Sequence, residues 1–98
     1  MSSIIRQFYS DYKLPERLIE QKIKVFDRHP DIASEFEYWI ANKRFKEIDA
    51  VIVDGYSAEK LASISSFLKG DGAFMLLIEL RESPDKAKSK IASGFKMK

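Results

Sequence analysis

The sequence predicts an all-α fold, a compact orthogonal or bundle-like array of five to six short helices in a single domain over residues 1–98. Apolar residues recur every three or four positions through most of the chain, which is the spacing of one helix face. Proline, serine and glycine interrupt these stretches where helices typically begin and end. Only residues 50–53, Ala-Val-Ile-Val, have the β-branched composition of a strand, and no second convincing run pairs with them. We therefore expect at most one short extended or irregular segment there.

Three helices are predicted in the first half of the chain. The one within residues 1–13 is short, so it must dock on its neighbours to be stable, and we expect it to be loosely docked. The second and third helices are predicted to begin with Pro15 and Pro30 at the first helical position, where the missing N–H costs nothing. Glu35 and Glu37 are expected to face away from the core. The predicted core residues of this half are Leu18, Ile23, Phe26, Phe36, Trp39 and Ile40.

Three further helices are predicted after Gly55. Ser57 is a good N-cap for a helix over residues 58–67, and Ser83-Pro84-Asp85 has the order of a cap, a first-position proline and a first-turn acid. Between them, residues 73–82 (AFMLLIELRE) are apolar nearly all round, which predicts the buried central helix. Residues 96–98 are expected to form a frayed tail. The predicted core residues of this half are Leu61, Ile64, Phe74, Leu77, Ile78 and Ile91.

The composition is that of an ordinary globular domain, with 45% hydrophobic and 33% charged residues. The absence of cysteine excludes disulfides and thiolate metal sites, and it fits a cytoplasmic protein. The longest apolar run, residues 73–78, is far shorter than the roughly 20 residues that a membrane-spanning helix needs. No basic and apolar leader opens the sequence. We therefore expect a cytoplasmic protein without a membrane partner.

No set of residues predicts a catalytic, cofactor or metal site. His29 is the single histidine and lies in a turn, and no serine lies in a Gly-x-Ser-x-Gly frame. The stretch 70–72 (Gly-Asp-Gly) lacks the remainder of a phosphate-binding loop, and the acids lack EF-hand spacing. Glu79 interrupts the apolar helix and, if buried, needs a partner such as Arg81 or a lysine of another helix. The chain is therefore predicted not to be an enzyme and to need no cofactor.

The leading functional hypothesis is a non-catalytic protein–protein interaction or adaptor module. Aromatic residues make up 12% of the chain, so some tyrosines are expected to lie outside so small a core, where they can contact another protein or a second copy of the chain. Self-association through the first helix or through residues 48–53 is one form of this hypothesis. The candidate interaction residues are Tyr9, Tyr12, Tyr38 and Tyr56.

The alternative hypothesis is DNA binding, which we do not favour. Residues 56–62 (YSAEKLA) resemble the opening helix of bacterial helix-turn-helix domains, and residues 80–82 resemble the end of the second helix. A base-reading helix needs basic or amide side chains on its outer face, whereas AFMLLIELRE carries one basic residue. The basic C-terminal stretch offers phosphate contacts instead, although a solvated helix face is its more ordinary interpretation. The candidate contacts to nucleic acid or an acidic partner are Lys86, Lys88, Lys90 and Lys96.

The wider pattern GYSAEKL, then GAF, then LRESP resembles a family of small helical proteins of Gram-positive bacteria that has no assigned function. The resemblance covers residues 53–98. It implies a compact helical fold, and it transfers neither an activity nor a functional residue to this chain.

Overall fold

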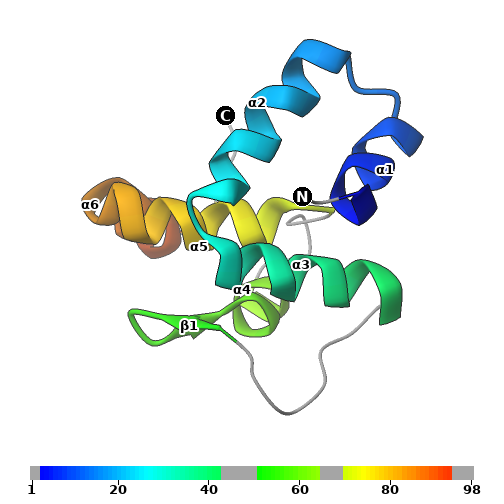
Figure 1. The fold of residues 1–98 in the computed structure, drawn as a ribbon. Helices are drawn as coiled ribbons and strands as arrows, with labels where there is room; N and C mark the ends of the chain where they lie inside the picture. Colours follow the sequence, from blue (N-terminus) through cyan, green and yellow to red (C-terminus); the bar gives the residue numbers. More distant parts are fainter. Residues whose placement is uncertain (1–2, 43–50, 65–69, 94–98) are drawn as a thin grey trace. The chain divides into compact units, whose positions relative to one another are not determined.

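The computed structural model describes residues 3–42, 51–64 and 70–93, which form six α-helices and one two-stranded hairpin (Figure 1). The all-α prediction is confirmed. The chain divides into Met1–Asp49, here unit 1, and Ala50–Lys98, here unit 2. The expectation of a single domain over residues 1–98 stays a prediction. Several predicted features, among them the end of the fourth helix near residue 67 and the frayed tail at 96–98, lie outside the described residues.

Unit 1 consists of α1 (Ser3–Asp11), α2 (Glu16–Asp27) and α3 (Pro30–Asn42), and each helix contacts the other two (blue to green in Figure 1). A helix as short as α1 has little stability in isolation, so packing against two neighbours is what maintains it. It buries Ile5 and Tyr9, which are four residues apart and so lie on one helix face.

Phe36 of α3 lies at the centre of the aromatic packing of unit 1. Its ring is fully buried and stacks on Phe26 of α2, with the ring centroids 5.2 Å apart. From α1, Phe8 meets Phe36 edge to face at 5.1 Å, and Tyr9 approaches it at 6.2 Å. These are the separations that aromatic pairs favour. One side chain thus joins all three helices of the unit.

The junction between α1 and α2 consists of a left-handed helix ending at Lys13 and a helix start at Pro15 that differs from the prediction. Lys13 has a left-handed backbone, φ 62°, and the amides of Lys13 and Leu14 donate to the carbonyls of Ser10 and Tyr9 at 2.9 and 3.2 Å. This is a Schellman ending, in a position that glycine usually occupies. Pro15 is the N-cap of α2 and not its first helical residue, because its carbonyl already accepts the amides of the first turn.

Three core predictions are wrong in unit 1 and unit 2. Leu18 is 38% exposed because the inner face of α2 follows Ile19, Ile23 and Phe26, and position 18 lies about 100° from position 19. Ile64 is 47% exposed although it follows the buried Leu61 by three residues, because it is the last residue of α4 (Ala58–Ile64). Glu35, expected to face away, is buried because it follows the buried Ile32 by three residues.

The remaining predicted core residues divide into two groups. Trp39, Ile40 and Ile91 are half-buried. The others are buried as predicted: Ile23, Phe26, Phe36, Leu61, Phe74, Leu77 and Ile78.

Unit 2 opens with a short antiparallel hairpin of β1 (Ile52–Val53) and β2 (Tyr56–Ser57), in which Ile52 faces Ser57 and Val53 faces Tyr56. The prediction of an extended segment is confirmed for residues 52–53, but the expectation that it has no strand partner is wrong. The pair is closed by Asp54 and Gly55, with φ of 54° and 84°. Two consecutive positive φ values define the type I′ turn, for which Asp-Gly is a favoured sequence.

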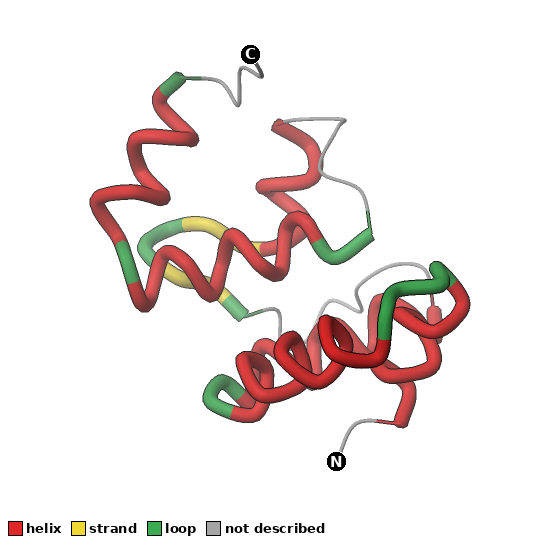
Figure 2. The backbone as a smooth tube through the Cα atoms, turned by 90° about the horizontal axis from the view of Figure 1, so that it is seen from above, coloured by secondary structure: helices red, strands yellow, loops and turns green. Residues whose placement is uncertain are grey.

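The helices of unit 2 are arranged around α5 (Gly72–Glu82), which contacts α4, β1 and α6 (Pro84–Ala92). Figure 2 shows the two strands beside these helices. Six residues of α5 are buried, from Ala73 to Leu80, so the apolar helix is the centre of unit 2. The predicted cap of α4 is also present, since the amide of Lys60 donates to Ser57 Oγ at 3.1 Å.

Candidate functional site

The four tyrosines predicted to form an interaction surface lie in different environments. Tyr9 is only 2% exposed, so its assignment to a surface is wrong. It follows the buried Ile5 by one helical turn, its ring lies 5.5 Å from that of Phe8, and Lys22 Nζ of α2 lies over its face at 5.5 Å. Tyr9 therefore belongs to the core of unit 1.

Tyr12 is exposed by 62%, at the end of α1, and it terminates a line of apolar residues. Ile4, Phe8 and Tyr12 are four residues apart, so they lie along one side of α1; we call them the α1 stripe. Ile4 is 42% exposed and Phe8 is half-buried between them. The Phe8 and Tyr12 rings meet edge to face at 4.8 Å, which holds the Tyr12 ring against the helix.

Tyr38 and Tyr56 are both half-buried. Tyr56 begins β2, pairs with Val53 and lies under Lys60 Nζ, which is 5.3 Å from its ring centroid. Lys60 Nζ also donates to the carbonyl of Gly55 at 3.4 Å. Tyr56 thus helps to hold the hairpin against α4, and it does not extend the α1 stripe.

Two of the four lysines proposed to contact nucleic acid are engaged within unit 2. Lys88 forms an ion pair with Asp54 at 2.8 Å, and Lys90 forms one with Glu79 at 3.0 Å. The hydrogen bond to Asp54 and the charge of that carboxylate raise the pKa of Lys88 above its usual value. Lys86 is exposed, and Lys96 lies outside the described residues.

Glu79 has the partner that its position in α5 requires. Its side chain is 21% exposed and pairs with Lys90 of α6. A lysine of another helix was one of the two partners predicted for it. The pair links the central helix of unit 2 to the helix that follows it.

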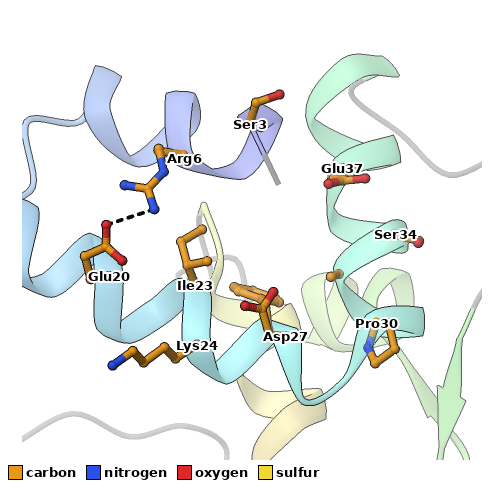
Figure 3. Close-up of a pocket in the computed structure, with 11 residues that line it drawn as sticks. Ser3, Arg6, Glu20, Ile23, Lys24, Asp27, Pro30, Ser34 and Glu37 are labelled. Carbon is orange, nitrogen blue, oxygen red and sulfur yellow. Dashed lines mark ion pairs between the residues drawn. The ribbon is translucent and has the colours of Figure 1, made fainter. Parts of the chain in front are cut away.

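A groove with a volume of about 770 Å³ lies among the three helices of unit 1 (Figure 3). Its apolar lining comes from α2 and α3, namely Ile23, Phe26, Pro30 and Ala33. Its charged lining consists of Arg6, Glu20, Lys24, Asp27 and Glu37, and Ser3 and Ser34 complete it. The size is within the roughly 300–1,000 Å³ of small-ligand sites. The sequence did not reveal this groove, because its lining comes from three separate helices.

Two carboxylates neutralise the arginine of the groove. Arg6 forms ion pairs with Glu16 at 2.8 Å and with Glu20 at 2.9 Å. The hydrogen bond to Glu20 is the main cause that raises the pKa of Arg6 above its usual value. In Figure 3, Arg6 reaches from α1 towards Glu20, Glu37 lies on α3, and Lys24 lies on the side of α2 that is turned away from α1.

The described residues show no arrangement typical of catalysis. His29 is half-buried at the start of α3, and within 3–42, 51–64 and 70–93 no group of three or more His, Cys, Asp or Glu side chains could hold a metal ion. None of the helices in the described ranges is long and apolar enough to cross a membrane.

The helix-turn-helix comparison places α5 in the position of the base-reading helix. Most of the apolar side chains of α5 are buried in the structure, and its one basic residue is Arg81 in the last turn. A helix with this surface has few groups that can reach base edges. Comparison of the chain with protein-family models, curated proteins and solved structures gave no match, so the resemblance of residues 53–98 to small helical proteins of Gram-positive bacteria stays a prediction.

Proposed function

We propose that the chain is a small, non-catalytic, cytoplasmic protein-binding module whose partner contacts the α1 stripe. The observation that carries this proposal is the exposure of Tyr12 and Ile4 on a helix whose other apolar side, Ile5 and Tyr9, is already buried in unit 1. The two ends of the α1 stripe, Ile4 and Tyr12, are therefore left exposed by the packing of unit 1. Tyrosine is a frequent anchor of interfaces because it combines a large apolar ring with a polar hydroxyl.

The packing of Tyr12 also supports a binding role. Its edge-to-face contact with Phe8 restricts the ring, and Phe8 is itself held against the buried Phe36. A side chain that is ordered before binding loses less conformational entropy when a partner covers it. Tyr12 is thus exposed to a partner while Phe8 and Phe36 hold its ring in place.

Photo-crosslinking in cells tests the proposal at single positions. A benzophenone amino acid replaces Tyr12 in one variant and Ser10 in the other; Ser10 is equally part of α1 and exposed, but lies on a different side of the helix. We expect adducts of discrete mass from position 12 and none from position 10. An adduct of twice the chain mass identifies a second copy, and any other mass identifies a different protein.

A substitution in the α1 stripe provides a second test within the same crosslinking experiment. Ile4→Lys should strongly reduce the adducts formed from position 12, because a charge is placed in the apolar contact, while Ser10→Lys should leave them unchanged. Equal adducts from positions 10 and 12, or adducts that Ile4→Lys does not affect, would exclude a partner on the α1 stripe.

DNA binding through α6 has weaker support. Lys88 and Lys90 are engaged by Asp54 and Glu79, so phosphate contacts would compete with existing ion pairs. We expect no retardation of duplex DNA by the protein at about 50 mM salt, where electrostatic binding is strong. A shift that disappears when Lys86, Lys88 and Lys90 are replaced together would instead establish the alternative.

A further inference from the structure

We propose that Asp54-Gly55, at the tip of the β1–β2 hairpin, is a site of spontaneous backbone modification, in which aspartate converts to isoaspartate through a cyclic imide. Asp-Gly is the sequence in which this reaction is least hindered, because glycine has no Cβ beside its own amide nitrogen. The site lies in unit 2, and its chemistry does not depend on a partner at the α1 stripe.

The modification has two steps, and water is the only co-reactant. The backbone nitrogen of Gly55 attacks Cγ of the protonated Asp54 carboxyl group, a C–N bond forms, and the carboxyl hydroxyl leaves with the amide proton as water. Water then opens the imide ring. Cleavage of the new C–N bond restores aspartate, whereas cleavage of the original peptide bond leaves isoaspartate, in which the chain runs through the former side chain.

The chain contains two Asp-Gly pairs, and the structure places them in different environments. Asp54 and Gly55 are both exposed, and a Cβ added at Gly55 would have no atom within 4 Å, so the space around this pair is open. Asp71 and Gly72 are half-buried; Asp71 is the N-cap of α5, and its carbonyl accepts the amide of Met75 at 2.8 Å. The same dipeptide should therefore react at two different rates in the folded chain.

The difference in rate arises from local opening. The imide ring needs the glycine nitrogen and Cγ on the same side of the aspartate Cα, which the type I′ turn at Asp54 does not provide, so the hairpin must open first. Opening it separates two strands of two residues each, whereas opening the start of α5 disturbs the buried central helix of unit 2. Small exposed elements open at a lower free energy than core helices.

The ion pair with Lys88 restrains the reaction at Asp54. One oxygen of the Asp54 carboxylate lies 2.8 Å from Lys88 Nζ. The carboxyl group must leave this cation and take up a proton before it can lose water. Because both side chains are about half exposed, at 45% and 55%, the pair is weak and slows the reaction without preventing it.

Isoaspartate at position 54 would alter the hairpin. It adds one methylene group to the backbone within a turn of only two residues, and the type I′ geometry no longer fits. The pairing of Val53 with Tyr56 should then be lost. Protein that carries isoaspartate at this position should therefore melt below fresh protein, and equal melting temperatures would contradict this consequence.

Ageing of the folded full chain, over several weeks at body temperature and mildly acidic pH, tests the proposed site. Peptide mapping with electron-transfer fragmentation measures isoaspartate at positions 54 and 71 separately. We expect it to accumulate at least about tenfold faster at position 54 than at position 71. In urea the two rates should be similar, because only the local sequence then matters. Similar rates in the folded chain, or no isoaspartate at position 54 while it forms there in urea, would overturn the proposal.

Substitution of the partner lysine tests the restraint. Lys88→Met should speed the reaction at position 54 about two- to threefold, the size expected for one exposed ion pair, and should leave position 71 unchanged. Lys86→Met, an exposed lysine of the same helix, is the matched control and should change neither rate. An unchanged rate in Lys88→Met, or equal acceleration at both positions, would contradict the role assigned to the ion pair. Crosslinking from position 12 reports the α1 stripe alone, so the two tests can fail separately.

Discussion

The turn of the β1–β2 hairpin requires a positive φ at Gly55. It has φ +84° in the type I′ turn, and a Cβ added there would have no atom within 4 Å. Gly55→Ala should therefore destabilise the protein by about 1 kcal/mol through backbone strain alone. Gly55→Asn should cost less, because asparagine tolerates this region better. Urea unfolding of both variants measures the difference, and equal costs would argue against strain as the cause.

At Lys13 we expect the opposite effect, because introducing a glycine there should stabilise the protein. It ends α1 with φ 62°, in the Schellman position that glycine fills without steric cost. Lys13→Gly should raise the free energy of unfolding by roughly 0.5–1 kcal/mol, the strain released less the entropy that glycine gains in the unfolded chain. Lys22→Gly, in the interior of α2, serves as the control and should lower it. A destabilising Lys13→Gly would show that the lysine side chain matters more than its backbone.

At the scale of elements, Phe36 connects the three helices of unit 1. Phe36→Ala removes a ring that contacts Phe8, Tyr9 and Phe26, and it should lower the free energy of unfolding by about 3–5 kcal/mol. Phe36→Leu keeps most of the apolar volume and should cost less than half as much. Thermal and urea unfolding measure both. Similar losses for the two variants would indicate that the aromatic geometry, and not the volume, determines the packing.

The ion pair between Asp54 and Lys88 connects the hairpin to α6, and its contribution depends on pH. Because Asp54 raises the pKa of Lys88 above 10.5 in the folded chain, the contribution is fully present below about pH 10.5 and is lost as the pH rises through the folded-state pKa. Wild type should melt above Lys88→Met at neutral pH, and the difference should shrink as the pH rises through the folded-state pKa of Lys88. Lys86→Met is the matched control, for which we expect no pH-dependent difference.

The elements differ in how much local sequence reveals. Prolines 30 and 84 begin helices as predicted, and Ser57 caps α4, since these signals act within a few residues. The hairpin carried a signal too, the pair Asp54-Gly55, but strands of two residues are too short for an alternating pattern to identify. Its pairing was therefore missed although its turn chemistry was visible.

The candidate site was less predictable than the fold. On α1, positions 4, 5, 8, 9 and 12 are all apolar or aromatic, and spacing alone does not say which part of this broad arc faces inward. Contacts with α2 and α3 bury Ile5 and Tyr9, and Ile4 and Tyr12 are left exposed. The groove depends on three helices at once, so no local pattern reports it.

At the scale of the whole molecule, the single-domain prediction can be tested by cooperativity. Units 1 and 2 each span about half of the chain, close to the lower limit for independent stability. We therefore expect a single unfolding transition, with the midpoint from Trp39 fluorescence, which reports unit 1, equal to the midpoint from helical circular dichroism. Leu77→Ala, in the core of unit 2, should shift both midpoints equally. Separated midpoints would show that the two units unfold independently.

Local sequence signals are enough to predict that this chain is helical, where most of its helices begin, and that the apolar helix from residue 73 is buried, because capping, proline geometry and apolar composition act within a few residues. Tertiary structure decided that Tyr9 is core while Tyr12 is surface, that Glu35 is buried, and that Lys88 and Lys90 are engaged by Asp54 and Glu79. These outcomes depend on which faces of different elements meet. Residues far apart in sequence make those contacts, so their environments emerge only when the helices pack.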